Sequence, residues 1–144
     1  MQFSAFTTSY GSKQNRLINE ATVYSGDDMM YTNAAQWDTG ATKTCISQAV
    51  VDRLGLISTA QTLVRTPSGE KVFSLYVVDI QLKNNVIVRD VQVIGSEIGA
   101  QSIDLLIGMD IIGLGDFAVT NVAGKTVFTF RIPSVEVIDF LTES

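Results

Sequence analysis

The sequence contains no histidine, and this absence excludes several kinds of enzyme chemistry. A chain without histidine cannot build a Ser-His-Asp triad, a Cys-His pair or a His-ligated metal site. Its single cysteine, Cys45, can form neither an internal disulfide nor a thiolate zinc site. Acid–base catalysis would therefore depend on carboxylates, lysine or tyrosine.

Charged residues are also scarce, at 17% of the chain, and the net charge of −5 comes without basic clusters. We therefore expect no binding to nucleic acid or to an anionic membrane. No apolar run approaches the ~20 residues of a membrane span. Residues Met1 to Lys13 lack the basic start and apolar core of a signal peptide. With the single cysteine, these features predict a cytoplasmic location.

The 144 residues are enough for one domain that buries about two-thirds of its unfolded surface. Strand-forming residues recur along most of the chain and long helix-period stretches are scarce, which predicts an all-β fold. The one clear helix signal is the apolar stripe Val50, Val51 and Leu54. Ser47 is suited to cap its start and Gly55 to end it. Met109–Ile112 could add a single second turn.

The expected strands are short and separated by turn residues. They are Ala21–Tyr24, Met29–Thr32, Leu63–Arg65, Val72–Leu82, Val86–Ile94, a buried run from Asp104 to Gly108, Phe117–Thr120 and Thr126–Phe130. Residues 1–14 indicate a loose arm or edge strand, and Val135–Leu141 a last strand or short helical tail. Pro67 and Gly69 indicate a turn, either in an ordinary hairpin or at the tip of a mobile flap.

Three patterns look like ligand sites but lack the required context. Gly124-Lys125-Thr126 resembles the end of a phosphate-binding loop without its opening glycine. Asp38-Thr39-Gly40-Ala41-Thr42 fits a phosphate element of actin-like ATPases, which need two large domains. Asp104, Asp110 and Asp116 recur at intervals of six, which matches neither helix nor strand, and lack the other oxygen ligands of a calcium loop. We therefore expect no cofactor and no metal.

Asp38 is the residue on which the functional hypothesis depends. It stands where the apolar run ending at Trp37 gives way to a turn at Gly40. A carboxylate beside the core is costly to bury unless it accepts hydrogen bonds or takes part in chemistry. It could equally cap its own turn through an Asx-type hydrogen bond. The tripeptide Asp-Thr-Gly alone does not decide between these interpretations.

Four elements in a fixed order carry a more specific signal. Asp38-Thr39-Gly40-Ala41 is followed by a helix containing Leu54-Gly55-Leu56, then by a hairpin carrying Ser68-Gly69, and last by Leu106-Ile107-Gly108-Met109-Asp110. In this combination the chain resembles the retropepsins, the single-domain aspartic proteases of retroviral type, and their bacterial members in particular. The resemblance covers roughly residues 20 to 131. It implies a single domain over 1–144, folded as a half-barrel with a flap hairpin.

The resemblance also implies roles for individual residues. Asp38 would be the catalytic aspartate, and its loop would be supported by Thr39, Gly40 and Ala41. The strand of Leu106, Ile107 and Gly108 would cross beneath this loop, and Ser68, Gly69 and Glu70 would form a flap tip over the substrate.

The implied activity is that of an aspartic endopeptidase working as a two-fold homodimer. Peptide hydrolysis by carboxylates needs two of them, and a two-fold axis would supply a second copy of Asp38. Two such groups ~3 Å apart share one proton because like charges oppose each other. The expected partners are a second copy of the chain and a peptide or protein substrate. The alternative is a non-catalytic dimerisation or peptide-binding module with the same fold, which would have no need of an intact Asp-Thr-Gly.

The chain departs from the viral pattern at several positions. Thr42-Lys43-Thr44 stands in place of a frequent acidic pair, and Met109 in place of a common arginine, so the ion pair between them is absent. Trp37 is larger than the usual residue before the aspartate. Terminal strands interleave in viral dimers, and the candidates here are Phe3–Tyr10 and Val135–Leu141, whose apolar residues lack an obvious core partner.

Overall fold

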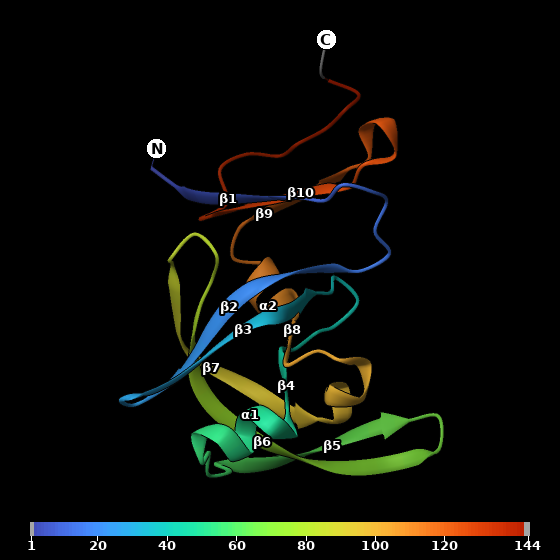
Figure 1. Cartoon of the computed structure of the whole chain (residues 1–144). Coiled ribbons are helices and arrows are strands. Elements are labelled where there is room, and N and C mark those ends of the chain that lie inside the picture. Colours follow the sequence, from blue (N-terminus) through green and yellow to red (C-terminus); the bar gives the residue numbers. More distant parts are fainter. Residues whose placement is uncertain (1, 143–144) are drawn as a thin grey trace.

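Ten strands in two sheets dominate residues 2–142, the part of the chain that the computed structural model describes (Figure 1). The strands are β1 (Ser4–Ser9), β2 (Leu17–Ser25), β3 (Asp28–Trp37), β4 (Cys45–Ser47), β5 (Ala60–Thr66), β6 (Gly69–Gln81), β7 (Ile87–Ser96), β8 (Leu105–Ile107), β9 (Asp116–Thr120) and β10 (Val127–Ile132). The same residues also form four helices. The α-helices are α1 (Gln48–Leu54) and α2 (Met109–Ile112), and the 3₁₀ helices are η1 (Glu97–Gln101) and η2 (Val122–Gly124). The expected all-β architecture with one or two short helices is confirmed. No helix in this range is long and apolar enough to cross a membrane.

The larger sheet has seven strands in the order β2-β3-β8-β4-β7-β6-β5. Strand β2 also pairs with β6, so the sheet curls back on itself as a partly closed barrel. The short strand β8 lies in its middle, parallel to β3 and antiparallel to β4. The strands that precede and follow the Asp38 turn are therefore both neighbours of β8.

The smaller sheet places β10 between β1 and β9, all antiparallel. It lies over one end of the larger sheet in Figure 1. The N-terminal segment is thus an edge strand of its own chain. The expectation that the apolar residues of Phe3–Tyr10 lack a core partner is wrong for Phe6, which is 7% exposed and contacts Phe128 and Phe130.

An aromatic cluster joins the two sheets around Trp37, the residue before Asp38. Its members are Phe6, Trp37, Phe117, Phe128 and Phe130, with neighbouring ring centroids 5.0–6.1 Å apart. Trp37 Nε1 donates a hydrogen bond to Oδ1 of the buried Asn19 at 2.9 Å. A buried indole N–H needs such a partner, so packing and hydrogen bonding together fix the end of β3.

Helix α1 begins and ends where the sequence predicts. The Ser47 hydroxyl accepts from Val50 N at 3.4 Å, and Gly55 adopts a left-handed φ of 58°. Val50, Val51 and Leu54 are buried. The single turn α2 is also present, and the expected hairpins form as β2–β3, β5–β6 and β9–β10. Strand β4 and helix η1 were not predicted from the sequence.

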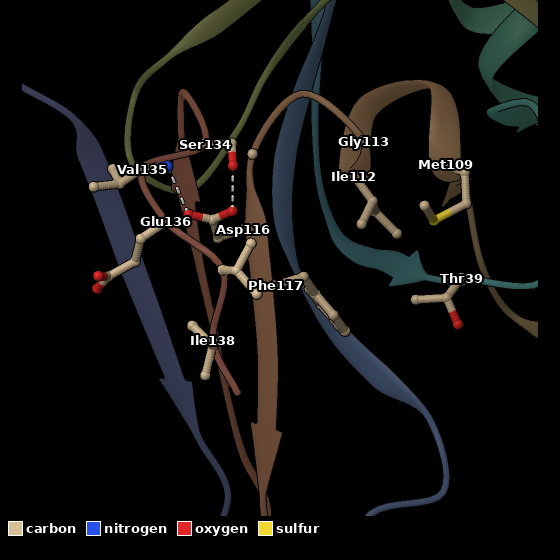
Figure 2. A pocket seen from close by; sticks show the side chains of 12 residues that line it. Thr39, Met109, Ile112, Gly113, Asp116, Phe117, Ser134, Val135, Glu136 and Ile138 are labelled. Carbon is tan, nitrogen blue, oxygen red and sulfur yellow. Dashed lines mark hydrogen bonds between the residues drawn. The ribbon is translucent and has the colours of Figure 1, made fainter. Parts of the chain in front are cut away.

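The tail Val135–Leu141 is neither strand nor helix, so that prediction is wrong. It is held instead by polar contacts to Asp116, as Figure 2 shows in part. Asp116 accepts hydrogen bonds from Arg131 Nε at 2.7 Å, Ser134 Oγ at 2.5 Å and Val135 N at 2.8 Å. These donors, the Ser134 hydroxyl foremost, hold the pKa of Asp116 well below its usual range. Asp116 is therefore the anchor of the tail.

If Asp116 anchors the tail as a carboxylate, Asp116→Asn should change the melting temperature in a pH-dependent way. A carboxylate whose native pKa is lowered stabilises the fold above its ordinary pKa, and this contribution is lost as the pH falls toward the native value. We expect Asp116→Asn to melt below the parent protein at pH 7, with the difference in melting temperature narrowing below about pH 4. Asp139→Asn, which changes an aspartate of the tail itself, is the control. A difference between Asp116→Asn and the parent that stays constant with pH would contradict the assignment.

Candidate active site

Asp38 emerges from the core directly after β3 and is half-buried. Its backbone N–H donates to Ile107 O at 2.9 Å, and its own carbonyl accepts from Ala41 N at 3.2 Å. The side-chain Oδ1 accepts from Gly40 N at 2.8 Å. Among the described residues none donates to Oδ2. The turn thus fixes one carboxylate oxygen by an Asx-type bond and leaves the other available.

Strand β8 holds the Asp38 turn from beneath. Trp37 lies opposite Ile107 in the parallel β3–β8 pair, and Cys45 lies opposite Leu106 in the antiparallel β4–β8 pair. Just beyond β8, Met109 N donates to Ala41 O at 2.7 Å. The loop between β3 and β4 is therefore fastened to the same short segment on both sides.

Gly108 is the closest contact between that segment and the loop. A Cβ atom at this position would lie 2.8 Å from both Ala41 O and Lys43 C. These are backbone atoms, which cannot rotate away as a side chain can. The absence of a side chain at Gly108 is what lets β8 pass under the loop.

A second carboxylate, Asp110, fastens the far end of the loop. Its Oδ2 accepts from Thr44 N at 3.0 Å and its Oδ1 from Thr44 Oγ1 at 2.8 Å. Thr44 Oγ1 in turn accepts from Gly108 N at 3.2 Å, and Thr44 is fully buried. This network occupies the region where the sequence analysis noted a missing ion pair. Asp110 ends the Leu-Ile-Gly-Met-Asp run noted in the sequence, but its bonds to Thr44 were not predicted from that run.

The other polar groups near the loop do not suggest a nucleophile or a metal site. Burial raises the pKa of the Cys45 thiol, and the carboxylates of Asp110 and Asp38 raise it further, so the reactive thiolate is disfavoured. The described residues contain no cluster of three or more potential metal-ligating side chains. Asp104, one of the evenly spaced aspartates, instead accepts a hydrogen bond from Thr32 Oγ1 at 2.7 Å.

Two hollows adjoin the Asp38 turn. A groove of about 270 Å³ between the ends of β2 and β3 and the edge of β9 is lined by Asp38 and Thr39 together with Trp37, Phe117 and Val119. A larger cavity of about 700 Å³ lies between α2, the start of β9 and the tail, with Thr39 at its border (Figure 2). Thr39 itself is exposed. Asp38 therefore borders a groove that is also lined by residues of β9.

The predicted flap tip lies on the β5–β6 hairpin. Pro67 and Ser68 form its two-residue turn, and Gly69 opens β6 with a φ of 120°. Glu70 lies opposite Arg65, with 3.6 Å between their charged groups. The hairpin projects toward the same side of the view as the loop after β3 (Figure 1). Within residues 2–142 no hydrogen bond joins this tip to the Asp38 turn.

A family model described as gag-polyprotein putative aspartyl protease matches residues 31–113, which include the Asp38 turn, the flap hairpin and β8. The chain belongs to this aspartyl protease family. A search of curated proteins gave no match.

Two solved structures resemble this family member. A retropepsin-like aspartic protease from Rickettsia conorii aligns over 91% of this chain and 96% of its own, with a TM-score of 0.55 and 12% identity. The protease of Simian Foamy Virus (mac) aligns over 67% of this chain and 92% of its own, with a TM-score of 0.48 and 21% identity. The retropepsin-like fold predicted from the sequence is confirmed. The roles implied for Asp38, Thr39, Gly40 and Ala41 stay predictions, as do those of the strand and flap residues.

The close contact at Gly108 predicts that Gly108→Ala destabilises the protein by about 1–3 kcal/mol, the usual cost of overpacking. Gly99→Ala is a matched control because a Cβ there meets only the Ser47 Cβ, at an ordinary 3.7 Å. We expect the control to change stability by less than about 1 kcal/mol. Urea unfolding of the three proteins measures the difference. Equal stability of the two variants would show that the loop yields at Gly108.

Proposed function

We propose that this chain is an aspartic endopeptidase in which two copies of Asp38, one from each subunit of a homodimer, form the catalytic site. The supporting observation is the position of Asp38, on a turn fastened by β8 and facing a groove, in a member of an aspartyl protease family. One chain supplies one carboxylate so placed, whereas hydrolysis of a peptide needs both a base and an acid. A two-fold axis supplies the second.

The chemistry follows from two carboxylates that share one proton. The ionised Asp38 removes a proton from water while the water oxygen attacks the carbonyl carbon of the peptide. The protonated Asp38 of the other subunit gives its proton to the carbonyl oxygen. Collapse of the tetrahedral intermediate breaks the C–N bond. The departing nitrogen takes the proton that the first Asp38 removed from water, and one hydroxyl of the intermediate returns its proton to the other Asp38, so that the dyad again holds one proton. Water and the peptide are the only other reactants.

The neighbouring residues support this chemistry in distinct ways. Thr39 is exposed beside Asp38, where its hydroxyl would bond across the dimer axis, and Gly40 N–H holds one Asp38 oxygen. On the flap hairpin, Leu63 and Val72 lie opposite each other and are each 60% exposed. Closing the tip of Ser68, Gly69 and Glu70 over a bound peptide would cover this apolar pair and exclude water. The substrate is a peptide or protein, and the cytoplasmic location stays a prediction.

Asp38→Asn should abolish cleavage of a peptide library while leaving the melting temperature equal or higher, because it removes one of two repelling carboxylates per subunit. Asp52→Asn, on the exposed face of α1, is the control and should cleave like the parent protein. The measurement is peptide cleavage beside a thermal melt. Unfolding of Asp38→Asn would make Asp38 a structural cap. A stable parent dimer that cleaves no peptide would favour the non-catalytic binding module.

Gly69→Val should reduce turnover much more than stability if the tip must bend over the substrate. Gly26→Val is a matched control, because both glycines are exposed, have positive φ and leave open space for a Cβ. Each substitution should cost about 1–3 kcal/mol of backbone strain. Only Gly69→Val should also lower kcat/KM beyond what its loss of stability explains. Equal losses of kcat/KM in Gly69→Val and Gly26→Val would show that the β5–β6 hairpin does not act as a flap.

A further inference from the structure

The two edges of the smaller sheet are not alike. On the β1 edge, Lys83 Nζ donates to Thr7 O at 3.2 Å, and Asn84 Nδ2 donates to Ser4 O at 3.1 Å. Ser4 Oγ also donates to Asn84 O at 3.4 Å. The turn after β6 thus covers this edge with side chains. A sheet edge satisfied in this way is a poor template for another strand.

The edge formed by β9 is uncovered. Strand β9 pairs only with β10, and within residues 2–142 its backbone has no hydrogen-bond partner on the other side. Within the described residues, the hydrogen bonds from the tail to β9 all go to the side chain of Asp116, and Ile138 borders the cavity on the face of the sheet that Ala118 also lines. The remaining residues, Phe117 to Thr120, are uncharged and mostly strand-forming. An edge of this kind presents a row of unpaired N–H and C=O groups to a further strand.

The β9 edge also borders the groove that contains Asp38. Phe117 and Val119 line this groove with Asp38 and Thr39. Any strand added to β9 would therefore bring its own chain beside the Asp38 turn. The proposed dyad needs such an approach, because each subunit carries half of it.

We infer that two copies of this chain pair through β9, antiparallel and about a two-fold axis, to form one continuous sheet across the dimer. This inference rests on the proposed function and names the interface that the function requires. A strand that pairs with its own copy about a two-fold axis is necessarily antiparallel, and centring it on Ala118 uses the whole of β9. Neither Phe3–Tyr10, already paired within its own chain, nor the tail is then the centre of the interface.

Two negative charges introduced next to the proposed two-fold axis would test the pairing of β9 with its copy. Ala118→Glu sets two carboxylates opposite each other and should raise the dimer dissociation constant by at least about tenfold. Ala5→Glu, at an exposed position of the opposite edge strand β1, is the control. Ala5 and Ala118 border the same small cavity on one face of the smaller sheet. They lie on its two opposite edge strands, β1 and β9. The control should keep the dimer and its specific activity. Sedimentation velocity and peptide cleavage over one dilution series measure both.

Covalent capture tests the pairing without relying on a disruptive change. Ala118→Cys in a Cys45→Ser background places two thiols on residues that face each other, with Cα atoms about 4.5–5.5 Å apart, a separation that a disulfide spans. Mild oxidation should give a covalent dimer whose specific activity no longer falls on dilution. Ala5→Cys in the same background should remain uncrosslinked.

The outcomes separate the interface from the function. Dissociation of Ala118→Glu together with an active, dilution-resistant Ala118→Cys dimer supports pairing through β9. An Ala118→Glu protein that dimerises and cleaves like the parent overturns this interface and leaves the shared dyad standing. A parent protein that stays monomeric with constant specific activity overturns the shared dyad and the interface together.

Discussion

The passage of β8 between β3 and β4 is the constraint on which the rest of the site depends. Ile107 O accepts from Asp38 N on one side, and Ala41 O accepts from Met109 N on the other. Between these bonds, Gly108 leaves no room for even one carbon atom against the loop backbone. The Asp38 turn therefore cannot shift without disturbing the middle of the larger sheet. In the proposed dyad, a carboxylate held this firmly would be preorganised before the substrate arrives.

Local signals were enough to predict much of this arrangement. The caps of α1 lie within one turn of its apolar stripe, and each hairpin is marked by the turn residues between its strands. Asp38 drew attention because a carboxylate directly after a buried strand is costly unless it is satisfied. Its catalytic role was implied only by the resemblance to the retropepsins and stays a prediction. The three residues of β4 are too few to show a period. The bond between Thr44 and Asp110 joins positions 66 apart, which no local pattern can reveal.

The tail shows how a tertiary contact overrides composition. Its apolar residues suggested a strand or a short helix, yet the segment forms neither, and Val137 and Leu141 are 90% and 95% exposed. The chain direction after β10 is decided by Asp116, which collects an arginine, a hydroxyl and a backbone N–H. Three charge-assisted hydrogen bonds at one carboxylate outweigh the weak preference of a short apolar segment for regular structure.

The same aromatic cluster that closes the core links the proposed interface to the aspartate. Phe117, on β9, stacks on Trp37 with ring centroids 6.1 Å apart and planes 14° apart. Trp37 precedes Asp38 and is fixed in turn by Asn19. Pairing of β9 with its copy would therefore position two rigid modules rather than two mobile loops. A dyad requires its two carboxylates within hydrogen-bonding distance of each other. The short and stiff connection from β9 through Phe117 and Trp37 to Asp38 would let the dimer interface set that distance.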